Sequence, residues 1–448
     1  MGALCGGNRL LLQIVVRGLV LRCYNLPPLF MVVSAILSQV VLINVSGRDR
    51  PGITSGLSSI LAKYHVTVLD IDQAVIHNNL SWGMLVDLDG HSAASTADSA
   101  GTDALFKDLL FKAHDLDLNI RFTPISSDAY SRWVDGSGHD RHIITLLGRR
   151  LGADLIAKLT AVVSELNWNI ESIQRMSPRI PIEAATSNPL IAVEFRINHQ
   201  SGGIDELRSA CLSLSHENDA DIAIQEDNIW RRTRRLVCFD MDSTLIQGEV
   251  IDLMAEAAGV GAQVSGITAR AMNGEIDFNT SFRQRLSLLK GLEVSRLNQI
   301  DEQLKITDGA DSLLRNLNRL GYKTAILSGG FTWFAEKLAA KLNIDHVHAN
   351  VLEIQDGKLT GGVVGDIINE ESKANLLQSI ADAEGIRLEQ VIAVGDGAND
   401  IPMLKKAGLG IAFHAKPTVR EQASNAFGTV GLDGILYLIG MREAEIHG

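Results

Sequence analysis

The chain has 448 residues, of which 46% are hydrophobic and 21% are charged, and at about 150 residues per domain this length predicts about three globular domains. Its formal net charge of −12 argues against a nucleic-acid-binding coat or a basic protein of the membrane surface, but it leaves room for a small anionic substrate. The four cysteines (Cys5, Cys23, Cys211 and Cys238) contain no CxxC pair. Neither a zinc site nor a disulfide framework is therefore indicated, and a reduced, cytoplasmic setting is expected.

Residues 1–37 are apolar with scattered arginines, as in "LLLQIVVRGLVLRC". Arg17, Arg22 and the pair Pro27–Pro28 interrupt the segment before about 18 uncharged residues accumulate, which argues against a membrane span. No small-residue cleavage site of the A-x-A type follows. A targeting segment is one interpretation. We favour a non-native leader with Met31 as the true start, and we expect no stable membrane association.

Residues 38–125 predict a small domain of mixed strands and helices. "VVLINVS" predicts a strand, "GRDRPG" a turn, and "ITSGLSSILAKY" a helix with apolar residues at helical spacing. Two further strands, "VTVLDIDQAVI" and "LSWGMLVDL", are separated by turn residues. The helix "TDALFKDLLFKAHDL" and the strand "LNIRFTPI" complete the unit. The predicted order is strand–helix–strand–strand–helix–strand, the split βαββαβ arrangement.

Residues 140–228 repeat this pattern. "WNIESIQRM" aligns with "VTVLDIDQA", so that Ile170 and Ile173 lie 102 positions after Val68 and Ile71. A duplication of this size predicts two similar small domains rather than a solenoid.

The basic segment "WRRTRR" at residues 230–235 separates the duplicated units from the rest of the chain. One interpretation is a localisation signal or a nucleic-acid patch. We favour a solvated linker, because the chain is acidic overall and no nucleic-acid partner is expected.

Residues 236–448 predict a doubly wound α/β domain. "LVCFD", "KTAILS" and "QVIAVGD" are apolar runs typical of strands buried in a parallel sheet, and helical segments lie between them. In this fold ligands bind at the carboxyl ends of the strands. Residues from about 249 to 305 show helical periodicity and no strand, which predicts a helical cap inserted after the first strand.

Four aspartates follow two of the predicted strands. Asp240 and Asp242 point the same way in an extended chain, and two carboxylates that close repel each other unless a cation or proton lies between them. Mg²⁺ is the natural candidate, because it prefers hard oxygen ligands and accepts substrate phosphate in its shell. Asp396 and Asp400, in "VGDGAND", supply further oxygen ligands.

Two other segments predict a phosphate site. "LSGG" offers the Ser328 hydroxyl and the backbone N–H groups of Gly329 and Gly330 just before a helix, where anions bind well. Lys373 begins another helix and can place a point charge on phosphate oxygens. Each segment alone has an ordinary structural explanation, such as Asp400 capping the helix "IPMLKKA". Their combination, each at a strand end or a helix start, is far more specific.

The motifs "DMDSTLI", "LSGGF", the lysine of "ESKANLL" and "GDGANDIPML" resemble the four motifs of the haloacid dehalogenase-like hydrolases. The segments "GEVID", "AMNGEIDF" and "SFRQRLSLLKGL" resemble those of the phosphoserine phosphatases within that family. The resemblance covers residue 236 to the end. It implies a Rossmann-like core and Mg²⁺-dependent hydrolysis of O-phospho-L-serine to L-serine, the last step of serine biosynthesis.

The resemblance also implies roles for the motif residues. Asp240 would attack the phosphate to form an aspartyl-phosphate, and Asp242 would protonate the departing serine oxygen and then activate water. The metal ligands would be Asp240, Asp396 and the backbone carbonyl of Asp242, while Asp400 would orient water or the lysine. The groups that hold the phosphoryl oxygens would be Ser328, Gly329 and Lys373.

Substrate choice is expected to come from the cap. Glu249 can pair with an ammonium group and Arg285 can hold a carboxylate, which together describe an amino-acid backbone. By resemblance, Met272 and Phe278 would close over the site and Asn399 would contact the substrate. The alternative for Glu249 and Arg285 is an ion pair between surface helices.

The duplicated units resemble ACT domains, small modules that bind amino acids. In the first unit the candidate effector residues lie in "GRDRPGI" between strand and helix: Gly47, Asp49, Arg50, Pro51 and Gly52. The alternative is a tight turn without a ligand. The second unit has "GRRLGAD" and lacks the Pro-Gly pair. We therefore expect serine to bind the first unit and to regulate a homodimer across its interface.

Two other functions remain open. One is a phosphatase of the same superfamily that acts on another ester, such as phosphothreonine or a phosphoprotein. The other is an amino-acid sensor with an inactive hydrolase domain, which the complete set of motif residues disfavours.

Overall fold

The computed structural model describes residues 40–88, 98–136, 141–179, 190–199 and 203–446. The leader, Met31, Cys5 and Cys23 lie outside the described residues. The chain divides into two compact units, residues 1–138 and residues 139–448.

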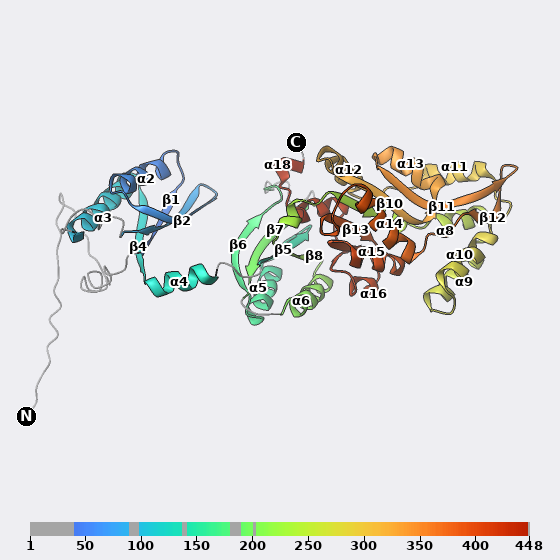
Figure 1. Ribbon diagram of the computed structural model, residues 1–448, viewed down its shortest axis with the longest axis horizontal. Helices are drawn as coiled ribbons and strands as arrows, with labels where there is room; N and C mark the ends of the chain where they lie inside the picture. The colour runs from blue at the N-terminus through green and yellow to red at the C-terminus, as the bar shows by residue number, and fades with distance from the viewer. Residues whose placement is uncertain (1–39, 89–97, 137–140, 180–189, 200–202, 447–448) are drawn as a thin grey trace, which may run out of the picture. The chain divides into compact units, whose positions relative to one another are not determined.

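The first unit contains a four-stranded antiparallel sheet in the order β2-β3-β1-β4. Helices α2 and α3 cover one face of this sheet (Figure 1), and Ile43, Leu57, Trp82 and Leu109 are buried between the layers. The elements are β1 (Val40–Arg48), α2 (Ile53–Lys63), β2 (Thr67–Ile76), β3 (Asn79–Asp87), α3 (Asp98–Asp115), β4 (Leu118–Ile125) and the following α4 (Ser127–Gly136). The predicted split βαββαβ order is confirmed.

The second unit begins with a copy of this arrangement. Its sheet has the order β6-β7-β5-β8, and Trp168, Phe195 and Leu207 lie in the apolar layer beneath α5 and α6. The elements are β5 (Arg141–Gly148), α5 (Ala153–Glu165), β6 (Asn169–Arg175), β7 (Ile191–Asn198), α6 (Ile204–Glu217) and β8 (Ala220–Glu226). The duplication inferred from the sequence is confirmed.

The rest of the second unit is built on a seven-stranded sheet in the order β12-β11-β10-β9-β13-β14-β15. All neighbouring pairs are parallel except β11 with β12. The strands are β9 (Leu236–Phe239), β10 (Lys323–Phe331), β11 (His346–Gln355), β12 (Lys358–Val364), β13 (Val391–Gly395), β14 (Leu409–Phe413) and β15 (Asn425–Phe427). The six parallel strands follow the doubly wound order, whose topological switch point lies between β9 and β13.

Helices cover both faces of the seven-stranded sheet. Successive residues of β9 alternate between two apolar clusters, with Val237 and Phe239 in one and Leu236 and Cys238 in the other, because side chains alternate along a strand. Cys211 and Cys238 are buried free thiols. The helices beside this sheet are α12 (Ala310–Arg319), α13 (Thr332–Leu342), α14 (Glu370–Ala383), α15 (Ile401–Lys406), α16 (Pro417–Arg420), α17 (Ile435–Leu438) and α18 (Glu443–Ile446).

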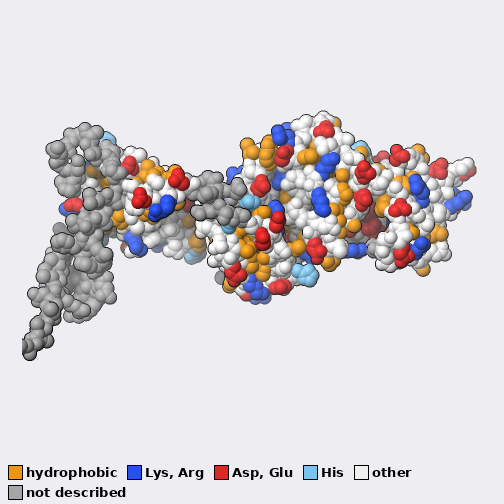
Figure 2. Space-filling model, turned by 60° about the horizontal axis from the view of Figure 1, so that its bottom comes forward, with side chains coloured by type: hydrophobic (Ala, Val, Ile, Leu, Met, Phe, Trp, Pro, Cys, Tyr) orange, Lys and Arg blue, Asp and Glu red, His pale blue; other side chains and the backbone are white. Residues whose placement is uncertain are grey.

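Four helices lie in the chain between β9 and α12, where the sequence predicted helices without a strand. They are α8 (Val250–Ala257), α9 (Gly261–Met272), α10 (Phe278–Ser287) and α11 (Val294–Gln303). Among the helices of the described residues, none has both the length and the apolar composition needed to cross a membrane. On the face of the second unit drawn in Figure 2, acidic and basic side chains are interspersed.

The basic segment at residues 230–235 is not a solvated linker, so that prediction is wrong. It includes part of the short helix α7 (Ile229–Arg232). The Arg231 side chain is buried and its Nη2 lies 2.6 Å from Oε2 of Glu194, which is also buried. Arg234 is buried as well and donates to the backbone carbonyl oxygen of Glu389 at 3.1 Å. These arginines join the second copy to the seven-stranded sheet.

Candidate active site

The site lies at the switch point of the seven-stranded sheet, where neighbouring strands end in aspartates. Asp240 follows β9 and Asp396 follows β13, and Phe239 pairs with Val394 in the parallel register. The backbone N–H of Asp240 donates to the carbonyl of Val394 at 2.9 Å. The fold therefore brings the two carboxylates to the same edge of the sheet.

A buried lysine lies between two of the predicted carboxylates. Lys373, near the start of α14, places Nζ 2.8 Å from Oδ1 of Asp240 and 2.7 Å from Oδ1 of Asp400. Burial opposes the charge of Lys373, but Asp240 and Asp400 outweigh that effect and raise its pKa. Burial also raises the pKa of Asp240, as do Asp400 and Asp396, while Lys373 counteracts this rise. A further cation at this site would favour the ionised form of these carboxylates.

Asp242 lies in a tight turn after β9. The turn requires Ser243 in the left-handed region, with φ at 54°, and Oδ1 of Asp242 accepts a hydrogen bond of 2.9 Å from the N–H of Val250, the first residue of α8. Burial raises the pKa of Asp242 to about 8, and the nearby carboxylate of Glu249 adds to the rise. Asp242 can therefore hold a proton at neutral pH, as a general acid must.

Three carboxylates could hold a metal ion. Oxygen atoms of Asp240, Asp396 and Asp400 lie within 4.8 Å of one another. Burial and Asp400 raise the pKa of Asp396 to about 7, which a divalent cation would reverse. Both oxygens of Asp400 already have partners, Lys373 at Oδ1 and the N–H of Gly397 at Oδ2, 2.9 Å away. The residues therefore fit a cation held by Asp240 and Asp396, with Asp400 positioning Lys373.

The predicted phosphate loop lies beside Asp242. The Ser328 hydroxyl is buried and accepts a 2.9 Å hydrogen bond from the N–H of Gly330. A Cβ at residue 330 would lie 2.5 Å from Oδ2 of Asp242, so only glycine fits this close approach. The carbonyl oxygen of Gly329 accepts from Nδ2 of Asn350 at 2.8 Å. The N–H of Gly330 therefore already has a partner within the loop, the Ser328 hydroxyl.

The predicted specificity residues surround this site on the cap side. The Ser243 hydroxyl donates to Oε1 of Glu249 at 3.0 Å. The Glu249 side chain keeps access to solvent, but the protein atoms around it shield the carboxyl and raise its pKa. Burial lowers the pKa of Arg285, while Glu249, Asp252 and Asp242 oppose that change. The structure records no direct ion pair between the described side chains of Glu249 and Arg285, which leaves both groups available to a substrate.

For the other residues predicted to contact the substrate, the structure gives their closeness to neighbouring glycines. Phe278 at the start of α10 covers the phosphate loop, because a Cβ at Gly329 would lie 3.2 Å from its Cζ. The side chain of Asn399 lies over Gly397, whose Cβ would be 2.2 Å from Oδ1 of Asn399. The side chain of Met272 lies outside the part of the chain that the structure describes.

Sequence analysis missed two polar residues of the site. The Thr244 hydroxyl is buried and donates to Oδ1 of Asp396 at 3.4 Å, and the only sequence signal was its place just after the paired aspartates. Asn350 holds the phosphate loop and also accepts from the N–H of Ile368 at 2.9 Å, which ties the loop to the segment before α14. The strand around it, "HVHANVLEIQ", mixes polar and apolar residues, so its sequence did not single out Asn350.

The predicted effector turn in the first unit is open. Asp49, Arg50, Pro51 and Gly52 are exposed, and Gly52 precedes α2 with φ at 92°. No side chain caps α2 and its first turn contains no acidic residue. The Arg50 guanidinium donates to the carbonyl of Leu116 and holds the turn against the end of α3. The free N–H groups of such a helix start can bind an anion.

The corresponding turn of the second copy is closed by its own chain. Gly152 precedes α5 with an ordinary extended backbone. A Cβ at this position would lie 2.3 Å from Oδ1 of Asp154, so the Asp154 carboxylate folds back over the helix start. The start of α5 therefore has an acidic side chain beside it, which the start of α2 lacks.

Comparisons with known proteins agree with this geometry. Residues 234–408 match the haloacid dehalogenase-like hydrolase family, and residues 39–123 and 140–225 match two ACT domain families. The phosphoserine phosphatase SerB2 of Mycobacterium tuberculosis is 38% identical over 407 residues, which cover 91% of this chain and 94% of that protein. The phosphoserine phosphatase of Streptomyces coelicolor is 39% identical over 409 residues, covering 91% and 93%.

Two solved structures have a similar fold. A haloacid dehalogenase family hydrolase from Salmonella enterica serovar Typhi has a TM-score of 0.59 at 30% identity and covers 67% of this chain and 98% of that one. A probable phosphoserine phosphatase from Vibrio cholerae has a TM-score of 0.51 at 32% identity and covers 66% and 86%.

Proposed function

Because the chain belongs to the phosphoserine phosphatases of the haloacid dehalogenase-like hydrolase family, we propose that it hydrolyses O-phospho-L-serine through an aspartyl-phosphate on Asp240. The observation that carries this proposal is the pair of buried aspartates at the switch point. Asp240 contacts the Lys373 ammonium at 2.8 Å, whereas burial raises the pKa of Asp242 to about 8. One carboxylate is thereby equipped to attack and the other to carry a proton.

In the first step a carboxylate oxygen of Asp240 attacks phosphorus and the bond from phosphorus to the serine oxygen breaks. Asp242 gives its proton to the departing serine oxygen. In the second step Asp242 takes a proton from water, the resulting hydroxide attacks phosphorus, and the bond from phosphorus to Asp240 breaks. Serine and phosphate leave, and both aspartates return to their starting states.

Mg²⁺, when bound by Asp240, Asp396 and the Asp242 carbonyl, would neutralise the charge of the carboxylates and the phosphate. Lys373 and Ser328 would hold the phosphoryl oxygens, on which charge is spread in the transition state. Asp400 keeps Lys373 in place through the 2.7 Å ion pair.

We propose that helices α8 to α11 form the cap that selects the substrate. Glu249 would bind the ammonium group and Arg285 the carboxylate of phosphoserine, while Phe278 covers the phosphate loop and excludes water. Asn399, in the loop after β13, would contact the substrate. Glu249→Gln and Arg285→Gln should each raise KM for phosphoserine far more than for an ester without an amino-acid backbone, such as p-nitrophenyl phosphate.

The deciding experiment measures phosphate release from phosphoserine by the full chain, with and without Mg²⁺. Asp240→Asn should lower kcat by about a thousandfold or more, because the covalent step is lost. The matched control, Asp366→Asn, changes an exposed aspartate and should leave kcat unchanged. Full hydrolysis by Asp240→Asn, or full activity in a chelator, would contradict the proposal. Equal activity on phosphothreonine or a phosphoprotein would instead favour the broader phosphatase, and no activity at all would favour the sensor.

Two regulatory features belong to the same proposal. Serine would bind at the open turn of residues 47–52 and regulate the enzyme. A homodimer is supported by β2, an edge strand on which Val68, Ile71 and Ile76 are exposed by 45%, 50% and 76%, since exposed apolar edge strands pair with other chains. Light scattering should report a dimer for the wild type and a monomer for Ile71→Lys.

A further inference from the structure

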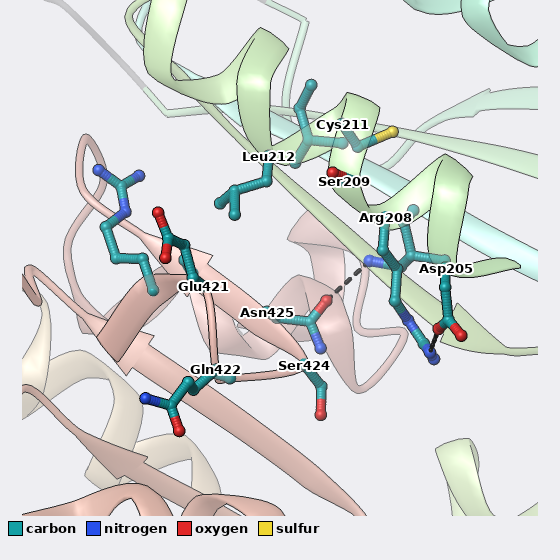
Figure 3. Close-up of a pocket in the computed structure, with 14 residues that line it drawn as sticks. Asp205, Arg208, Ser209, Cys211, Leu212, Glu421, Gln422, Ser424 and Asn425 are labelled. Atoms are coloured by element: carbon teal, nitrogen blue, oxygen red, sulfur yellow. Dashed lines mark hydrogen bonds and ion pairs between the residues drawn. The ribbon is translucent and has the colours of Figure 1, made fainter. Parts of the chain in front are cut away.

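A cavity of about 450 Å³ lies between the second ACT domain and the catalytic domain. Figure 3 shows its walls: α6 and β8 on one side, and on the other residues 420–426, which lead from the end of α16 into β15. None of the residues assigned above to the catalytic site or to the open turn lines this cavity. It is therefore a separate site, and it can be occupied without blocking the aspartates at the switch point.

Three buried N–H donors in the walls lack a hydrogen-bond partner among the described residues: Nε of Arg208, Nε of Arg420 and Nδ2 of Asn425. The Asn425 side chain is only 5% exposed. Its Oδ1 accepts from the N–H of Ile224 at 2.7 Å, which fixes the amide so that Nδ2 points away from that bond. In Figure 3 Asn425 lies among the side chains that line the cavity. Buried donors in proteins normally have acceptors, so these three can bind acceptor atoms of water or of a bound molecule.

We propose that this cavity binds a small molecule through an oxyanion, either a carboxylate or a phosphate group. All three unpartnered atoms are donors, and two belong to guanidinium groups, which stay charged and suit the oxygens of carboxylates and phosphates. The acids nearby do not fill this role. Asp205 contacts Nη1 of Arg208 at 3.3 Å from a side chain that is 90% exposed, and Glu421 is exposed. The volume suits a small metabolite.

A molecule bound here would contact both sides of the domain junction. Arg208 belongs to the second ACT domain, whereas Arg420 and Asn425 belong to the catalytic domain. A ligand that binds only the docked arrangement stabilises that arrangement, and the stabilisation grows with the logarithm of ligand concentration above Kd. If the proposed function holds, both products are candidates, because phosphate is an oxyanion and serine carries a carboxylate.

The test follows the thermal unfolding of the full chain with added inorganic phosphate, and in parallel with L-serine, against chloride at equal ionic strength. The protein is first passed over a chelating resin, because without a cation the carboxylates of Asp240, Asp396 and Asp400 repel phosphate from the catalytic site. We expect the wild-type midpoint to rise by about 2 °C or more. Arg208→Gln and Arg420→Gln should each abolish most of this rise, and Arg296→Gln, an exposed arginine on α11, should keep it.

The positive charge of Arg420 also favours the ionised form of Asp221 at the junction and so lowers its pKa. Arg420→Gln alone could therefore weaken docking. Arg208→Gln avoids this difficulty, since Arg208 pairs with the exposed Asp205, and Arg420→Lys keeps the charge without the Nε donor. A rise with phosphate but not with serine assigns the site to a phosphate group, and the reverse assigns it to a carboxylate. The proposal is overturned if neither compound raises the wild-type midpoint, or if the rise survives in both arginine variants. Loss of phosphoserine hydrolysis with an intact Arg208-dependent rise would overturn the proposed function alone.

Discussion

The two ACT domains share one strand order and differ at two places, the turn before the first helix and the last strand. In the first domain the turn before α2 is open and the last strand, β4, is partly exposed along its length. In the second domain Asp154 closes the turn before α5, and all but the last residue of β8 are buried. The first copy has an uncapped helix start, and the second copy packs against the catalytic domain through β8.

Matched positions show how the second copy docks. Asn119 pairs with Ser46 in the first sheet and Asp221 pairs with Leu147 in the second, at equivalent points of the register. Asn119 is exposed. Asp221 is fully buried and accepts from the N–H groups of Gly428, Thr429 and Val430 at 2.7, 3.0 and 3.0 Å. The exchange of an exposed amide for a buried carboxylate accompanies the new interface.

The largest effect is expected from removing this carboxylate. Asp221→Ala would leave three backbone N–H groups without their acceptor and should lower the free energy of unfolding of the second unit by about 4 kcal/mol. Urea unfolding of the full chain, followed by tryptophan fluorescence, measures the change. The matched variant Asn119→Ala should change stability by no more than about 0.5 kcal/mol. Equal effects of the two variants would show that the copies do not differ in docking.

The next largest loss of stability is expected from breaking the buried ion pair between Arg231 and Glu194. Glu194 lies opposite Thr145, whereas the first sheet has Gly83 opposite Asn44 at the same point of its register. Arg231→Met would leave the buried Glu194 without its 2.6 Å partner and with only the longer 3.8 Å contact to Arg196, and it should cost about 3 kcal/mol. The double variant Arg231→Met with Glu194→Leu removes both charges and should recover most of that loss. A double variant less stable than the single one would mean that the pair itself, rather than the orphaned charge, stabilises the interface.

Much of this comparison could be predicted from the sequence, because it rests on local patterns. The alternation of side chains and the repeat spacing predicted both copies, and the missing Pro-Gly pair indicated that the second turn differs. The docking could not be predicted. "ADIAIQ" is as apolar as any strand core, and Asp221 alone would be taken for an exposed residue. The backbone N–H donors that satisfy it come from residues 207 to 209 positions later in the chain.

The catalytic site shows the same limit. Motif spacing predicted which aspartates meet at the switch point, since strand ends converge in this fold. It could not predict that both oxygens of Asp400 are engaged or that Thr244 contacts Asp396, because those contacts depend on loop conformation. The burial of Arg231 was missed for a related reason. A run of arginines in an acidic chain is usually solvated. Only the fold shows that Glu194 lies beside Arg231 as its ion-pair partner.

A smaller change in stability is expected from substituting the glycine of the open turn before α2. Gly52 has φ at 92°, and an added Cβ would find no atom within 4 Å. Gly52→Ala should therefore cost about 1 kcal/mol in the first unit through backbone strain alone, and it should weaken the serine response. In the second copy Gly152 has an ordinary backbone, so Gly152→Ala needs only a shift of the Asp154 side chain and should cost less. Thermal unfolding with and without serine measures both; a larger loss from Gly152→Ala would contradict the difference between the turns.

The smallest effect on stability comes from exchanging the residues that distinguish the two helix starts. Thr54 and Asp154 each lie two residues after the glycine that precedes the helix. Thr54→Asp would place an internal carboxylate at the start of α2, where it gains about 0.5 kcal/mol from the helix dipole and loses the 3.0 Å hydrogen bond to Gln73. Stability should hardly change, yet serine should no longer affect activity, because the new carboxylate occupies the place of the ligand's own. Asp154→Thr is the matched control and should leave the serine response of the first turn intact. If Thr54→Asp still responds to serine with unchanged affinity, the effector does not bind at this helix start.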